Sequence, residues 1–202
     1  VIDLRGRQFA EDQGPLAHPV RPESFQEINN FYTATVYEKG AEVIGMLHRL
    51  VGPDAYAKAL DLYFERHDGQ ACTIEDWLQV FEDTTGRDLA QFKRWYSQAG
   101  TPTLSVKETW DAGTYVLTFT QNLTPSATTP DPQPQVIPIL TGLLNASGKE
   151  ILPSQVLDRS HAVLHIRRSG RTPHRIRIAR FLSAGCIGKP LARYTNRVFA
   201  GA

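Results

Sequence analysis

The chain has 202 residues, of which 41% are hydrophobic and 21% are charged, and its formal net charge is +1. This length allows one large domain or two small ones with a real core, and the composition excludes disordered, collagen-like and coiled-coil chains. No apolar run approaches the ~20 residues needed to cross a bilayer, and no signal-peptide pattern is present. Two cysteines, Cys72 and Cys186, make no disulfide framework. We therefore expect a cytoplasmic protein with reduced thiols, one long-range bridge being the alternative.

The charge is distributed unevenly along the chain. Residues 1–154 contain 12 Lys and Arg against 20 Asp and Glu, a net charge of −8, whereas residues 155–202 contain 10 against one, a net charge of +9. Such an asymmetry is typical of a tail that binds nucleic acid or membrane, or of a last segment whose origin differs from that of the rest of the chain. The chain begins Val-Ile-Asp-Leu without an initiator Met, so we expect a piece of a longer protein.

The first 36 residues give a mixed pattern. Three prolines before residue 23 predict a loop, or a helix end followed by a loop. Phe25, Ile28 and Tyr32 then recur at helical spacing, but the Thr- and Val-rich segment 32–36 disfavours a continuous helix.

Four amphipathic helices are predicted between residues 37 and 98. The first ends at Gly52, and Pro53 opens the second. A capping box formed by Thr73 and Asp76 opens the third, and Asp88 is expected to cap the fourth. The side chains expected to face the core are Val43, Met46, Leu47, Leu50, Tyr56, Ala59, Leu60, Tyr63, Phe64, Trp77, Leu78, Phe81, Leu89, Phe92, Trp95 and Tyr96.

Near Gly100 the pattern changes from helical to alternating. A β-hairpin is predicted over residues 104–119 with a turn at 111–113, followed by a proline-rich loop over 124–134. Further strands are expected at 136–144, 151–152 and 162–166, with a turn at 145–149. The sequence thus predicts an α+β chain, with four helices followed by a small all-β module.

No complete catalytic motif is present. The sequence contains no H-E-x-x-H, C-x-x-C, G-x-S-x-G, P-loop or G-x-G-x-x-G, and its histidines are scattered. His48 and His67 lie beside charged neighbours on predicted helices, which is typical of solvated or capping residues. One stretch is distinctive, because Tyr37 at the start of an amphipathic helix is followed by Glu-Lys-Gly-Ala. From the pattern alone, such a Tyr is more often a packing residue.

Five segments in a fixed order resemble the aminopeptidase N family of zinc aminopeptidases, gluzincins with a thermolysin-like catalytic domain, and in particular its bacterial alanyl aminopeptidase branch. The resemblance extends from residue 1 to about residue 160. Its segments are QFAED (8–12), AHPVRP (17–22), NNFYTATVYEKGAEV (29–43), LYFERHDG (62–69) and RWYSQAGTP (94–102).

The resemblance implies a fold, a cofactor and a site. Residues 1–100 would be the helical C-terminal part of the catalytic domain, and residues 101–163 a partial β-sandwich. In this family H-E-x-x-H and a later Glu hold zinc. Both precede the matched segment, so zinc would belong to the parent enzyme and this chain would hold no metal. Tyr37 matches the tyrosine whose phenol donates a hydrogen bond to the attacked carbonyl oxygen, while Tyr32 and Glu38 resemble positions near the substrate pocket.

The resemblance ends at about residue 164. Residues 164–202 are rich in Arg and contain no acidic residue. An out-of-frame reading of a GC-rich gene tends to have this composition, so a frameshifted tail is our first hypothesis. An unusual surface is the second, and a nucleic-acid-binding tail is the third, which the scarcity of interleaved aromatics disfavours.

Three functions follow for the whole chain. The first is a fragment of an aminopeptidase that removes N-terminal residues from peptides, its partner being the N-terminal half of the catalytic domain. The second is a non-catalytic interaction module, and the third is a nucleic-acid binder; no membrane partner is expected. By itself the chain should be inactive, bind no zinc tightly, and expose an apolar face where the missing half would pack.

Overall fold

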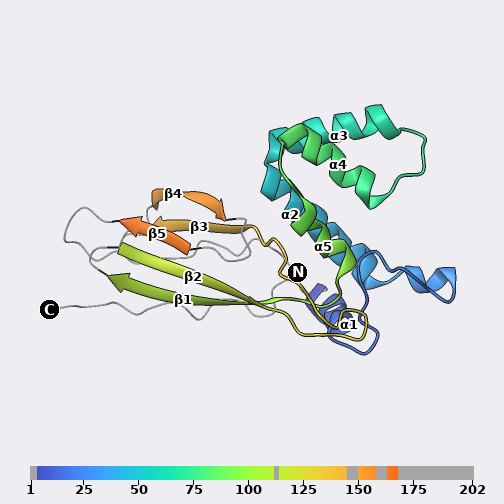
Figure 1. Cartoon of the computed structure of the whole chain (residues 1–202), viewed down its shortest axis with the longest axis horizontal. Helices are drawn as coiled ribbons and strands as arrows, with labels where there is room; N and C mark the ends of the chain where they lie inside the picture. The colour runs from blue at the N-terminus through green and yellow to red at the C-terminus, as the bar shows by residue number, and fades with distance from the viewer. Residues whose placement is uncertain (1–3, 112–113, 145–149, 158–162, 168–202) are drawn as a thin grey trace.

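Helices and strands lie on opposite sides of the molecule in the computed structural model (Figure 1). The structure describes residues 4–111, 114–144, 150–157 and 163–167. The α+β class predicted from the sequence is confirmed. In the described part of the chain, no helix combines the length and apolar character that a membrane span requires.

Short helical turns make up the segment before residue 40. A π-helical turn, η1 (Leu4–Gln8), runs into the short helix α1 (Phe9–Asp12), and a second π-helical turn, η3 (Thr35–Lys39), runs into α2. The helical spacing after residue 24 produces only the 3₁₀ turn η2 (Ile28–Phe31). The side chains of Phe25, Ile28 and Tyr32 stay exposed, because no described element covers that face.

The four predicted helices are confirmed as α2 (Gly40–Val51), α3 (Pro53–His67), α4 (Ile74–Thr85) and α5 (Ala90–Ser97). Gly86 ends α4 with a φ of 67°, in the left-handed region that favours glycine. Thr73 and Asp76 form the predicted capping box. The helix α5 begins two residues after Asp88, whose Oδ1 accepts a hydrogen bond from Ala90 N at 2.8 Å.

Most of the side chains predicted to face the core are buried or packed against it, but Leu60 is only half-buried and Phe64 is not buried. Phe64 was expected to point inward, but its side chain is 60% exposed. Only Ala59 of α3 is fully buried, since this helix lies at the edge of the bundle and contacts α4 and α2 along one narrow stripe.

The strands form two antiparallel sheets. β1 (Thr103–Asp111), β2 (Thr114–Asn122) and β5 (Val163–Arg167) form one sheet in the order β1-β2-β5. β3 (Ile139–Leu144) and β4 (Glu150–Leu157) form the other. The predicted hairpin is confirmed as β1 and β2, with Leu104 opposite Gln121 and Val106 opposite Phe119. The predicted turn at 145–149 lies outside the described residues.

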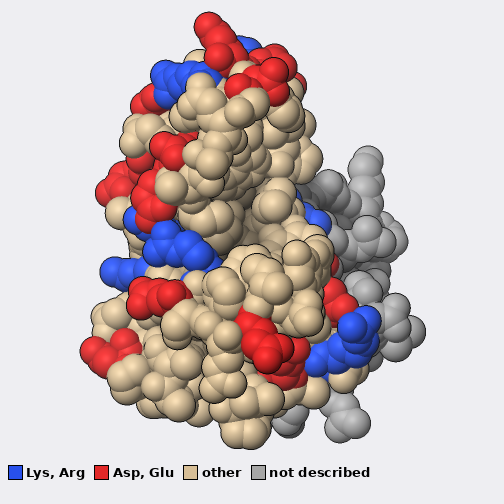
Figure 2. Space-filling view, turned by 90° about the vertical axis from the view of Figure 1, so that its right-hand side faces the viewer, with Lys and Arg blue, Asp and Glu red and all other residues tan. Residues whose placement is uncertain are grey.

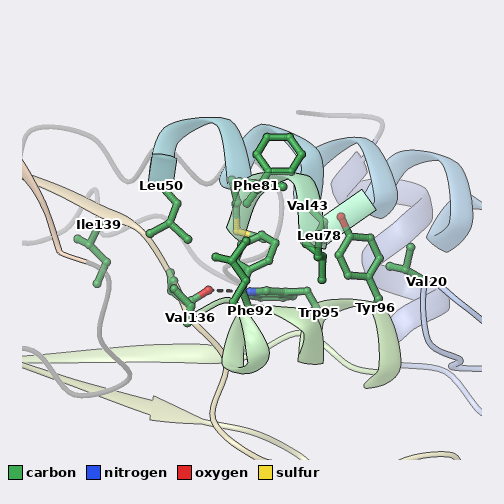
Figure 3. Close-up of a cluster of buried hydrophobic side chains, with 14 of the residues drawn as sticks. Val20, Val43, Leu50, Leu78, Phe81, Phe92, Trp95, Tyr96, Val136 and Ile139 are labelled. Carbon is green, nitrogen blue, oxygen red and sulfur yellow. Dashed lines mark hydrogen bonds between the residues drawn. The ribbon is translucent and has the colours of Figure 1, made fainter. Parts of the chain in front are cut away.

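The proline-rich loop between β2 and β3 makes hydrogen bonds to the α5 end of the helical half. We expected a strand to begin at Val136, but β3 begins at Ile139. The backbone just before β3 bonds to the helical half and not to a strand: the Val136 carbonyl accepts a hydrogen bond from Trp95 Nε1 at 2.6 Å (Figure 3). Gln98 makes a two-way amide pair with the backbone of Gln133, accepting at 2.6 Å and donating at 2.9 Å.

One continuous hydrophobic cluster crosses this junction. It includes Met46 and Leu47 of α2, Phe81 of α4, Trp95 of α5 and Phe119 of β2, all of them at most 1% exposed. Figure 3 shows Val136 beside Phe92 and Trp95 of α5, and the same cluster includes Ile139 of β3, so the β module and the helices share part of one core.

Replacing Trp95 with Phe should therefore loosen the junction. The variant loses the indole N–H that donates to the Val136 carbonyl, and it leaves unfilled volume at a side chain with no exposed area. We expect the free energy of unfolding to fall by about 2–3 kcal/mol, measured by urea denaturation. Trp77→Phe, at a partly buried indole in α4, is the matched control and should lower it by about 1 kcal/mol. Equal losses in the two variants would contradict the role of the Trp95 hydrogen bond.

Candidate active-site segment

Tyr37 lies in the middle of η3 and its side chain is 60% exposed. Its ring stacks against that of Tyr32, with centroids 6.1 Å apart and an interplanar angle of 20°. The Tyr37 hydroxyl makes no hydrogen bond within the described part of the chain. A neutral phenol in this state has a free proton to donate to a ligand.

Tyr37 is one end of a row of aromatic rings. Phe25 packs edge-on against Phe31, Phe31 packs edge-on against Tyr32, and Tyr32 stacks on Tyr37. The segment that carries this row lies on the side away from the strands (Figure 1). Figure 2 views the molecule from that side and shows uncharged surface across the middle of the face, with charged side chains mainly around it.

Glu38 is the other residue predicted near a substrate pocket. Its Oε1 lies 3.3 Å from Nη1 of the exposed Arg7. Its Oε2 is buried and has no hydrogen-bond partner among the described residues. The carboxylate is thus held beside η1, with one oxygen free to accept a hydrogen bond.

A fully buried ion pair holds Lys39, the last residue of η3. Lys39 Nζ lies 2.9 Å from Asp12 Oδ2, and both side chains have no exposed area. Lys39 also donates to the Gly100 carbonyl at 3.0 Å. Asp12 accepts from Gly100 N at 2.9 Å and from the Thr101 hydroxyl at 2.7 Å. The network therefore ties α1 and η3 to the point where the β module begins.

The surroundings of Asp12 keep its carboxyl ionised. Burial by itself raises the pKa of this carboxyl, but the Lys39 ammonium and the hydrogen bonds from Lys39, Thr101 and Gly100 together outweigh it. The pKa consequently lies below its ordinary value of 3.8.

Glu11, the neighbour of Asp12, holds the opposite end of η3. Its Oε1 accepts a hydrogen bond from the backbone N–H of Thr35 at 2.8 Å. The same oxygen lies 3.6 Å from His18 Nε2, too far for a hydrogen bond, and His18 Nδ1 is 2.8 Å from the Pro19 carbonyl. Two consecutive acidic residues of α1 therefore fix the two ends of the turn that carries Tyr37.

The loop that contains residues 17–22 is anchored on the helical bundle. Arg21 N donates to the Tyr96 carbonyl at 2.9 Å, and the Arg21 guanidinium binds both carboxylate oxygens of Glu75. Hydrogen bonds from Lys93 and Arg21 lower the pKa of Glu75 to about 2. This anchoring places the loop against the start of α2, since a methyl carbon of Val20 lies 3.5 Å from where a Cβ on Gly40 would stand.

Comparison with known proteins assigns this segment to a family. Residues 1–96 match the family described as the peptidase family M1 domain. The chain is 45% identical over 174 residues to aminopeptidase N of Escherichia coli K12 and 56% identical over 118 residues to that of Caulobacter vibrioides. Residues 1–96 belong to the M1 peptidase family, in the aminopeptidase N group. The resemblance stated from the sequence is thereby confirmed.

The match covers most of this M1 chain but little of its relatives. It includes 85% of this chain and 20% of the Escherichia coli protein, and 58% and 14% for the Caulobacter protein. The crystal structure of Legionella pneumophila aminopeptidase A in complex with aspartic acid is similar to it in fold, with a TM-score of 0.65 and 27% identity. That similarity covers 74% of this chain and 17% of the Legionella chain. The M1 chain thus spans about a fifth or less of these relatives.

The strands match a second family. Residues 100–174 match a domain of unknown function described as having an Ig-like fold. This match, and β5 at Val163–Arg167, continue beyond residue 163, where we had placed the end of the β-sandwich. The rest of the Arg-rich tail, from residue 168, lies outside the described residues.

The M1 family is zinc-dependent, but the residues described in this M1 chain do not fit a zinc site. Across the described ranges, no three His, Cys, Asp or Glu side chains are grouped so that they could hold a metal ion.

The structure brings two of the three predicted site residues into contact. Tyr32 and Tyr37 stack, whereas Glu38 points to Arg7. Sequence reasoning gave no role to Glu11, Asp12 or Lys39. The only signals were the Glu-Asp pair in the first resembling segment and the Lys of the Glu-Lys-Gly-Ala stretch. The hydrogen bonds that give these residues a role join positions 24 to 89 residues apart.

Removing one member of the buried ion pair should destabilise the chain strongly. Lys39→Met leaves the Asp12 carboxylate buried without its cation, so we expect a loss of about 3–5 kcal/mol in the free energy of unfolding. Adding Asp12→Asn removes the orphaned charge and should recover part of this loss. Arg66→Met, which breaks the exposed pair with Asp83, should change stability by less than about 1 kcal/mol. A loss no larger than that of Arg66→Met would refute the importance of the pair.

The same pair makes stability depend on pH. Because the pKa of Asp12 is lower in the folded chain than its ordinary value of 3.8, its stabilising contribution is present above that value and is lost as pH falls through the lowered pKa. Thermal unfolding followed between pH 7 and pH 3 should show a steeper fall for the wild type than for the Lys39→Met, Asp12→Asn double variant. Parallel curves would show that other carboxyls control acid unfolding.

Proposed function

We propose that this chain is part of a zinc-dependent M1 aminopeptidase that hydrolyses N-terminal residues from peptides. Its helical half would be the C-terminal part of a thermolysin-like catalytic domain. Its partner would be the N-terminal half of that domain, which would hold the zinc, and the parent enzyme would act in the cytoplasm. The observation that carries the proposal is the exposed Tyr37 phenol, whose hydroxyl makes no hydrogen bond to the described residues. Its turn is held at Thr35 by Glu11 and at Lys39 by Asp12, within a segment that matches the M1 family.

The role we propose for Tyr37 is to donate a hydrogen bond to the attacked carbonyl oxygen. Peptide hydrolysis places negative charge on that oxygen in the transition state, so a fixed donor stabilises the transition state more than the substrate. A phenol suits this role because it keeps its proton at neutral pH. Tyr32, stacked on Tyr37, and Glu38, with its free Oε2 atom, would border the bound peptide.

Tyr37→Phe in the full-length enzyme tests the role. We expect kcat on an aminoacyl anilide to fall by about 10²–10³, with little change in KM, because the lost hydrogen bond forms mainly in the transition state. Tyr63→Phe is the matched control, since it removes a phenol hydroxyl from α3 and should leave kcat within about twofold. An unchanged kcat in Tyr37→Phe would refute the assignment.

The coding sequence upstream of residue 1 tests the rest of the proposal. An in-frame H-E-x-x-H motif there, followed by a Glu, would supply the zinc ligands that the described residues lack. If no such motif is encoded, the interaction-module reading becomes the better one. In that case the chain by itself should be tested for a binding partner. Nucleic acid is the least favoured of the possible partners.

A further inference from the structure

We propose that Glu11 is a positioning residue for the Tyr37 phenol, acting through the backbone of η3 and not through contact with substrate. This inference rests on the proposed function, because it assigns to Tyr37 the role described above. It concerns how a turn of five residues holds one side chain in place.

The first step is that local residues complete only part of the N-terminal cap of η3. The Thr33 hydroxyl accepts from Val36 N at 3.1 Å, but the N–H of Thr35 is bound by a distant side chain. The N-terminal N–H groups of a helical turn have no acceptor within the turn, and a side chain normally supplies one. Here the cap position is Ala34, which has no acceptor and makes no side-chain cap hydrogen bond. Thr35, the first residue of η3, has no exposed area, so water cannot serve its N–H. The Oε1 atom of Glu11, which lies 24 positions earlier in the chain, accepts that bond.

The second step is that Glu11 completes a two-point clamp. At the other end of η3, Lys39 is held by Asp12 and by the Gly100 carbonyl. Glu11 and Asp12 are consecutive in α1, so both anchors move together with one short helix. Tyr37 lies midway between the anchored residues, and its ring projects from the turn with 60% of its area exposed.

The third step is the sensitivity of the chemistry to position. A donor stabilises a developing oxyanion only when it lies within about 2.7–3.1 Å of it. A displacement of about 1 Å can lower the rate about 10²-fold. Losing one end of the clamp frees the wider π-helical turn to relax towards a regular helical register, which would rotate residue 37.

The carboxylate of Glu11 has two properties that substitutions can separate. Glu11→Gln keeps an oxygen at the same reach but loses the charge. Glu11→Asp keeps the charge but withdraws the oxygen from Thr35 N. If Glu11 acts through its hydrogen bond to η3, Gln should substitute for it and Asp should not. If it acts through its charge on the nearby His18 ring, the order is reversed.

The experiment is a kinetic double-mutant cycle in the full-length enzyme, with thermal unfolding measured on every variant. We expect Glu11→Asp and Glu11→Ala to lower kcat by about 10- to 10²-fold with KM nearly unchanged, and Glu11→Gln to stay within about threefold of wild type. In a Tyr37→Phe background, Glu11→Ala should lower kcat by less than about twofold, because the group it positions is gone.

Two results would overturn the inference while the function of Tyr37 stands. The first is an equal loss from Glu11→Ala with and without the Tyr37 hydroxyl, which indicates a general structural role. The second is Glu11→Gln as damaging as Glu11→Asp, which indicates a role for the charge. Failure of the proposed function itself is recognised separately, by a Tyr37→Phe single variant with unchanged kcat. Should Glu11→Ala fail to fold, the Gln and Asp variants still decide between hydrogen bond and charge.

Discussion

The buried ion pair between Asp12 and Lys39 is the constraint on which the rest of the segment depends. Two charges with no exposed area would be expensive to bury unless every lone pair and proton had a partner. Here the Gly100 backbone and the Thr101 hydroxyl complete the network. Three stretches far apart in the chain meet at this pair, so it determines where η3 lies and where the β module begins.

The helical and β halves are joined by polar contacts around an apolar centre. Carbonyls of the loop before β3 accept hydrogen bonds from the side chains of Trp95, Arg94 and Gln98. The Gln121 side chain of β2 both donates to and accepts from the backbone of Gln135, as Gln98 does with Gln133. Side-chain amides and an indole thus satisfy backbone groups that a proline-rich segment cannot pair in a sheet. The hydrophobic cluster continues beneath them, which makes the start of the β module part of the helical core.

The candidate site is built on this rigid frame but is itself open. Tyr37, Tyr32, Phe25 and Ile28 expose half or more of their side chains, on a segment with only short turns. Exposed apolar side chains gathered in this way are typical of interaction surfaces. That arrangement agrees with a chain that spans about a fifth or less of its M1 relatives.

The sequence alone determined the four helices, the Thr73–Asp76 capping box and the hairpin, because helical periodicity, glycine and proline signals and strand alternation are local properties. It also indicated Tyr37, through resemblance to a family. It could not place Glu11, Asp12 and Lys39, since a charged residue reads as solvent-exposed until tertiary contacts show a partner. The helical pattern likewise predicted Phe64 in a core that does not reach it, and the apolar run from Val136 predicted a strand that begins only at Ile139. Only the tertiary structure decided these points, because burial and pairing depend on residues that are distant in the chain and adjacent in space.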